Sequence, residues 1–88
     1  MDEQDSPFDF PCPFPIKVIG RDVSGFPAHV IQLISAHVGE IADEDVRVRT
    51  SSNGTFLALT VTVQASSREQ LDNIYRSLSA SELILYVI

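Results

Sequence analysis

The chain has 88 residues, a hydrophobic fraction of 44% and a formal net charge of -6 at pH 7. That length suits a single domain, because a second domain would lack residues for a core of its own. The acidic balance disfavours nucleic acids as partners, since phosphate backbones need compensating cations.

The sequence is typical of a cytoplasmic protein. No apolar run approaches the roughly 20 residues that a membrane helix needs, so no membrane partner is expected. The chain begins with an acidic stretch, whereas a secretory signal begins with basic residues and an apolar run. The single cysteine, Cys12, allows no internal disulfide, which fits a reducing compartment.

Four of the five prolines lie in the first fifteen residues. Because proline lacks an amide donor and has a fixed φ angle, this stretch is predicted to be neither a helix nor a central strand. We expect residues 1–9 to form a flexible acidic tail and residues 10–88 to form the domain. Phe8, Phe10 and Phe14 alternate with prolines, and their rings are expected to dock on the domain.

A strand is predicted at residues 16–20, with Ile16 and Val18 on one face and Lys17 and Ile19 on the other. A polar turn follows this strand and leads into the next element.

Residues 25–38 have the pattern of an amphipathic helix. Ser24 is the expected N-cap, and Pro27 is compatible with the first turn, where its missing N–H has no partner anyway. Gly39 is expected to end the helix. The apolar stripe consists of Phe26, Val30, Leu33, Ile34, His37 and Val38.

A β-hairpin is predicted from residues 46–52 and 55–63, joined by Asn53 and Gly54 in a two-residue type I′ turn. This turn sets the register, which places Val46 opposite Val61, Val48 opposite Leu59 and Thr50 opposite Leu57. The apolar face consists of Val46, Val48, Leu57, Leu59 and Val61. The opposite face consists of Arg47, Arg49, Phe56, Ala58 and Thr60. Both strands agree on which face is apolar, and this agreement supports the register.

A second helix is predicted to begin at Ser67, which forms a capping box with Gln70. Its apolar stripe consists of Leu71, Ile74, Tyr75 and Leu78. The final segment, residues 81–88, is apolar and rich in residues that favour strands, so it is predicted to be the last strand.

The predicted order is β-α-β-β-α-β, and each helix has one apolar stripe. Both helices must therefore cover the same side of the sheet. The predicted fold class is α+β, a ferredoxin-like two-layer sandwich in which a four-stranded antiparallel sheet carries two helices on one face. Right-handed crossovers place the first and third strands in the centre.

An ordered set of residues along this chain is similar to the YbeD-like family of small bacterial proteins. The set consists of Phe10, Pro11, Cys12, Phe14, Lys17, Val18, Gly20, His37, Ser51, Ser52, Gly54, Gln70, Tyr75 and Leu78. The resemblance runs from about residue 10 to residue 88, and it implies a fold like that of ACT regulatory domains. It implies no biochemical activity. Pro13 and the helix start at residues 25–27 depart from the usual pattern of the family.

The first candidate site is the sheet face without helices, where Lys17, Arg47, Arg49 and Phe56 are expected. Arginine and phenylalanine are favoured in the cores of protein interfaces, so a protein partner is predicted for this face. RNA is the less favoured partner, because only one aromatic is placed there and the usual RNA-recognition signature is missing.

The second candidate site is the turn between the first strand and the first helix, with Gly20, Arg21, Ser24 and Gly25. ACT-like domains often bind small effectors near this turn, so the resemblance suggests an effector loop. The same turn is similar to the phosphate cradle of acylphosphatases, but Asp22 adds a repulsive charge there. Acylphosphatase activity is therefore the weaker interpretation.

Metal binding and catalysis are both disfavoured by the sequence. His29 and His37 are eight residues apart on one helix, rather than the four that stack two ligands on one face. We expect His29 to face solvent, His37 to close the apolar stripe and Cys12 to be a small buried residue. The acidic residues 43–45 are interpreted as a solvated loop. No cofactor and no metal is predicted.

The sequence therefore predicts a non-enzymatic protein-interaction or regulatory module. The alternative is a small-effector-binding domain of the ACT type. Its partner is expected to be an unidentified protein, and the chain itself is expected to be a monomer or a weak homodimer.

Overall fold

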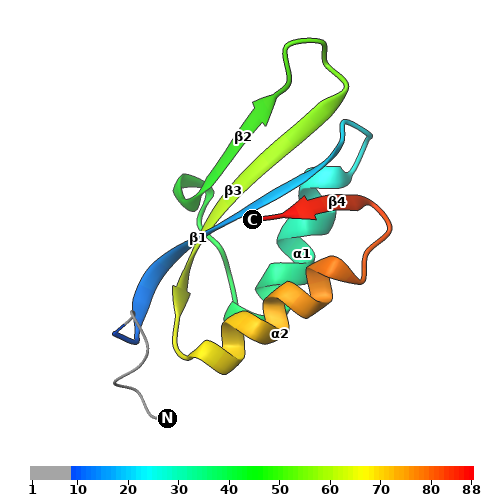
Figure 1. Ribbon diagram of the computed structural model, residues 1–88. Helices are drawn as coiled ribbons and strands as arrows, with labels where there is room; N and C mark the ends of the chain where they lie inside the picture. The colour runs from blue at the N-terminus through cyan, green and yellow to red at the C-terminus, as the bar shows by residue number, and fades with distance from the viewer. Residues whose placement is uncertain (1–8) are drawn as a thin grey trace.

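The computed structural model describes residues 9–88 (Figure 1). Phe8, whose ring was predicted to dock on the domain, lies outside these described residues. So do residues 1–8 of the predicted acidic tail, and only its last residue, Asp9, is described. The helices and strands are β1 (Cys12–Arg21), α1 (Phe26–Val38), the 3₁₀ helix η2 (Asp43–Asp45), β2 (Val46–Thr50), β3 (Phe56–Ala65), α2 (Arg68–Ser79) and β4 (Ile84–Val87).

The four strands form one antiparallel sheet in the order β2-β3-β1-β4. Both helices cover the same face of this sheet, and the opposite face carries no helix (Figure 1). The predicted ferredoxin-like α+β fold is confirmed, including the central position of the first and third strands. Phe10 and Phe14 are half-buried against the core, as predicted.

The prediction that the proline-rich stretch avoids a central strand was wrong, because β1 already begins at Cys12 and pairs with β3 through Pro13 and Pro15. The amide of Lys17 donates toward β4, to the carbonyl of Ile88. By the two-residue period, Pro13 and Pro15 face that same side, which β4 does not reach. Their missing N–H groups therefore cost no ladder hydrogen bond.

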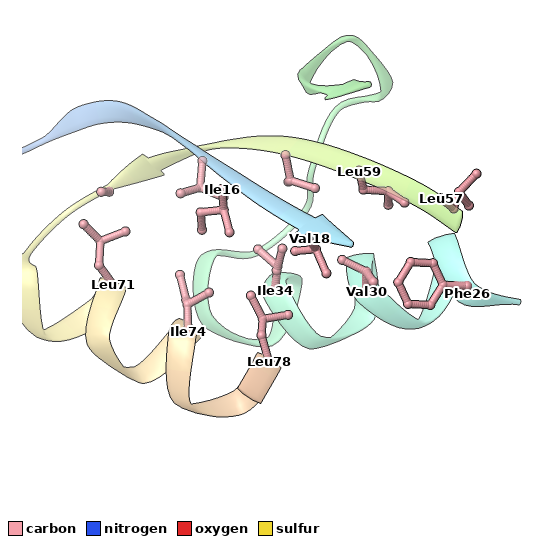
Figure 2. Packing of buried hydrophobic residues seen from close by; sticks show 13 residues of the cluster. Ile16, Val18, Phe26, Val30, Ile34, Leu57, Leu59, Leu71, Ile74 and Leu78 are labelled. Atoms are coloured by element: carbon pink, nitrogen blue, oxygen red, sulfur yellow. The ribbon is translucent and has the colours of Figure 1, made fainter. Parts of the chain in front are cut away.

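The core lies between the sheet and the two helices and consists of thirteen buried side chains, ten of which are labelled in Figure 2. Ile16, Val18 and Leu59 come from the two central strands and have no exposed surface. The labelled residues of α1 and α2 point toward this layer from the opposite side (Figure 2). Burial of these stripes explains why the short helices are stable.

The entry to α1 differs from the prediction. The helix begins after Gly25, which has φ 84°, and no side chain caps it. Ser24 is exposed and is not the N-cap, so that prediction was wrong. A left-handed residue at this position suits glycine because it has no Cβ. The arrangement brings the ring of Phe26 against Gly20, where there is no room for a side chain.

The hairpin has the predicted register but a different turn. Thr50 pairs with Leu57, as expected. Of the described residues only glycines have positive φ angles, so Asn53 does not adopt the type I′ conformation. Instead the amide of Gly54 donates to the carbonyl of Ser51, and the side chain of Asn53 accepts from the hydroxyl of Ser51. This longer loop, residues 51–55, joins the same strand positions as the predicted turn.

Val48 was predicted to be a core residue, but 51% of its surface is exposed. It lies on the helix side of β2, as the alternation indicates. The core residues of both helices, however, pack over the central strands, so β2 is left without a helical cover (Figures 1 and 2). Alternation predicts the face of a residue, but burial also requires an element on that face.

Side chains along the seam between α1 and α2 form hydrogen bonds. The Nε2 atom of His37 lies 2.9 Å from the hydroxyl of Ser77. His29 was predicted to face solvent, but it is half-buried, and its Nε2 atom lies 2.8 Å from the hydroxyl of Ser81. Both histidines therefore join α1 to α2 or to the loop that follows it.

Gln70 connects three segments at one end of this seam. Its backbone N–H donates to the side chain of Ser67, the N-cap of α2. Its side-chain oxygen accepts from the amide of Ser66, and its side-chain nitrogen donates to the carbonyl of His37 near the end of α1. The predicted cap is present, although the glutamine reaches Ser66 rather than Ser67.

We expect Gln70→Ala to lower the free energy of unfolding by about 1–2 kcal/mol, because it leaves the amide of Ser66 and the carbonyl of His37 without their partners. Urea denaturation measures this difference. The matched control is Gln32→Ala on the exposed side of α1, with an expected change within about 0.5 kcal/mol. Equal losses in the two variants would contradict the connecting role of Gln70.

Candidate interaction surface

The sheet face opposite the helices is called the open face here. Successive side chains of a strand point to opposite faces of the sheet, so the residues that alternate with core residues along each strand lie on the open face. These are Lys17, Ile19 and Arg21 on β1, Arg47 and Arg49 on β2, Phe56, Ala58, Thr60 and Thr62 on β3, and Tyr86 on β4.

The strand register arranges this face in rows. One row runs from Arg47 through Thr60 to Lys17. Neighbouring side chains in such a row have Cβ atoms about 5 Å apart, so the two cations flank the threonine hydroxyl. The structure thus brings together Lys17, Arg47 and Arg49, as the alternation predicted.

The next row holds apolar side chains. It runs from Arg49 through Ala58 and Ile19 to Tyr86. Phe56 lies on the same face, opposite Arg21 at the end of β1. Phe56 is 37% exposed and Tyr86 is 65% exposed. The open face therefore combines exposed aromatic side chains with the cationic groups of β1 and β2.

A hollow of about 890 Å³ is lined mostly by residues of this face. Its lining residues are Lys17, Glu44, Asp45, Arg47, Val48, Arg49, Ala58, Thr60 and Thr62. The acidic residues come from η2, which packs beside β3. The cations and hydroxyls of this lining are groups that bind carboxylates, while Glu44 and Asp45 add negative charge to it.

Charge is distributed unevenly over the molecule. The chain has six lysines and arginines against twelve acidic residues. Four of the six cations, namely Lys17, Arg21, Arg47 and Arg49, are on the open face. The other two, Arg68 and Arg76, lie on α2. An acidic protein thus presents a local cationic face, which net charge alone does not reveal.

The predicted effector loop is arranged differently from the open face. Gly20 and Arg21 are the last two residues of β1, and Gly20 is buried. The amides of Asp22, Val23 and Phe26 already donate to carbonyls of Thr55, Arg21 and Val23 respectively. Ser24 and Gly25 are exposed in the turn. Three amides that an anion cradle would use are therefore engaged within the protein.

Other reactive groups are dispersed over the described part of the chain. Among residues 9–88, no group of three or more histidine, cysteine, aspartate or glutamate side chains is placed to hold a metal ion. Cys12 is half-buried near the start of β1. Desolvation raises the pKa of the Tyr75 phenol, whose hydroxyl lies 3.5 Å from the carbonyl oxygen of Ile88.

Comparison with known proteins identifies the family. Residues 5–88 match the family model described as "Protein of unknown function (DUF493)". The chain belongs to the DUF493 family. The UPF0250 protein of Chromobacterium violaceum is 44% identical over 87 residues, which cover 99% of this chain and 98% of the relative. The UPF0250 protein of Janthinobacterium sp. is 42% identical over 88 residues, which cover all of this chain and 97% of the relative. The YbeD-like resemblance is thereby confirmed.

Solved structures agree with the fold of this DUF493 chain. Protein HP0495 of H. pylori has a TM-score of 0.72 at 18% identity, covering all of this chain and 96% of its own. The ACT domain from GTP pyrophosphokinase of Chlorobium tepidum has a TM-score of 0.68 at 13% identity, covering 86% of this chain and 94% of its own. These likenesses show an ACT-like ferredoxin fold. Within residues 9–88, no helix is long and apolar enough to cross a membrane.

Proposed function

We propose that this DUF493 chain is a non-enzymatic interaction module of the cytoplasm, and that its open face binds an acidic surface of a protein partner. One observation supports the proposal most strongly: four of six cations share a single sheet face with two exposed aromatic side chains. Aromatic residues and arginine are enriched at protein interfaces.

Arginine is the main contributor to this interface. Its planar group binds carboxylates in a bidentate manner and stacks on aromatic rings. Arg47 and Arg49 lie on an edge strand, where arginine also prevents unwanted strand pairing. Phe56 and Tyr86 supply the apolar area that a partner would bury. A small effector at residues 20–25 is the alternative, with less support because the amides there are already used.

We expect Arg47→Glu combined with Arg49→Glu to abolish partner binding and to leave the fold intact, since both side chains are exposed. The matched control is Arg68→Glu with Arg76→Glu, which makes the same change in net charge on α2. Partners captured from a bacterial lysate are quantified by mass spectrometry for the wild type and both variants. The proposal requires proteins that the wild type and the α2 variant retain and the β2 variant loses.

Equal capture by both double variants would exclude the open face as the contact surface. Loss of capture in both variants alike would indicate a response to net charge rather than to a specific face. An unchanged amide NMR spectrum outside the substituted residues verifies that each variant is folded.

A further inference from the structure

We propose that the acidic N-terminal segment, residues 1–8, docks on the open face of its own chain and competes there with the partner. The competition rests on the function proposed above, whereas the docking does not. The segment carries Asp2, Glu3 and Asp5 and has no basic side chain.

Charge complementarity is the first argument for this docking. Lys17, Arg47 and Arg49 are exposed on the open face. The helix-covered side offers a less attractive surface, because its two cations, Arg68 and Arg76, lie at opposite ends of α2.

Reach is the second argument. The segment joins the described chain at Asp9, and the backbone bends at Phe10 and Pro11 just before β1. Eight extended residues span at most about 29 Å. From Cys12 to Lys17 the strand rises about 17 Å, so the distance lies within this span. Residues 5 and 17 are each six positions from residue 11. If the chain turns back along β1 at residue 11, residue 5 therefore lies beside Lys17.

The expected docking is weak, because ion pairs between exposed side chains gain little and are screened by salt. A tethered segment nevertheless acts at a high effective concentration, so weak contacts suffice to compete with a partner in solution. Docking by ion pairs is therefore expected to weaken as the salt concentration rises, whereas a stably packed segment would stay in place.

Paramagnetic broadening of amide NMR signals tests the docking. A nitroxide is placed on Gln4→Cys in a chain that also carries Cys12→Ala. At about 20 mM salt, the signals of Lys17, Arg47 and Thr60 are expected to lose at least about half their intensity, and to recover at about 500 mM. The control combines Asp2→Asn, Glu3→Gln and Asp5→Asn in the same labelled chain, and its open-face signals are expected to remain strong.

Equal broadening in the labelled chain and its neutral control, or broadening confined to α1 and α2, would overturn the docking. A label-free measurement serves if Cys12→Ala perturbs the fold. In that case the amide shifts of the open face are compared between the wild type and the neutral segment over the same salt range. Identical shifts would again overturn it.

Partner capture tests the competition. The unlabelled full chain with the neutral segment is expected to recover at least about twofold more partner than the wild type at low salt. Equal recovery would refute the competition even if the docking is observed. Failure of the proposed function would give a different result, namely unchanged partner capture by the chain that carries Arg47→Glu and Arg49→Glu.

Discussion

Leu59→Asp is expected to leave the chain unfolded at neutral pH. Leu59 has no exposed surface and lies on β3, one of the two central strands. The substitution removes a packed side chain, at a cost of about 2–5 kcal/mol, and also buries a charge without a partner. A domain of this size has a total stability of only about 4–13 kcal/mol, and short domains have thin margins.

The neighbouring residue provides the control. Thr60→Asp introduces the same carboxylate one position further along β3, but on the open face between Lys17 and Arg47. This variant is expected to keep a dispersed amide spectrum, whereas Leu59→Asp is expected to show the narrow dispersion of an unfolded chain. A native-like spectrum for Leu59→Asp would contradict the assignment of the two sheet faces.

Gly20→Ala is expected to lower the free energy of unfolding by about 2–4 kcal/mol, which is large for one methyl group. A Cβ atom at this position would overlap the ring of Phe26 and would lie 2.7 Å from the carbonyl oxygen of Leu83. Phe26 is fully buried, so its ring has no solvent-filled space to enter. Relief therefore requires movement of α1 or of the chain before β4.

A second substitution separates this clash from an effect on the strand alone. Phe26→Leu shortens the side chain that meets Gly20, so the two substitutions together should cost less than the sum of their separate costs. Thermal or urea denaturation of the four proteins in this cycle gives the coupling. Additive losses would show that the contact between Gly20 and Phe26 does not limit the size of residue 20.

The sequence was sufficient to predict the fold because several local patterns agree. The alternation of β2 and β3 predicts one apolar face on each strand, and the apolar stripe of α2 contains Leu71, Ile74 and Leu78, all of which are buried. These patterns depend on local periodicity, which tertiary packing preserves. The register survives the wrong turn type, because Thr50 still pairs with Leu57.

The failures have a common physical origin in contacts between distant segments. Pro13 and Pro15 are accommodated in β1 only because β4 is too short to reach them, and no local pattern gives the length of β4. Val48 is exposed because no helix covers β2. The contact of His29 with Ser81 depends on how α1 meets the loop after α2, 52 residues further along the chain.

The candidate surface was only partly predictable, because part of it depends on contacts between distant segments. Lys17, Arg47 and Arg49 follow from alternation within their own strands. Tyr86 was missed, because a register shift in the pairing of β1 with β4 interrupts the simple alternation of the last strand. With Tyr86 included, the open face has two exposed aromatic residues rather than the one that was expected.

The most direct test of the open face is an amide-resolved NMR titration of the labelled chain with two fractions of a bacterial extract, one of macromolecules and one of metabolites. The macromolecular fraction is expected to shift or broaden the signals of Lys17, Arg47, Arg49 and Thr60, and the metabolite fraction is expected to leave them unmoved. Shifts caused by the metabolite fraction and clustered at residues 20–25 would contradict this expectation and would favour an effector-binding domain.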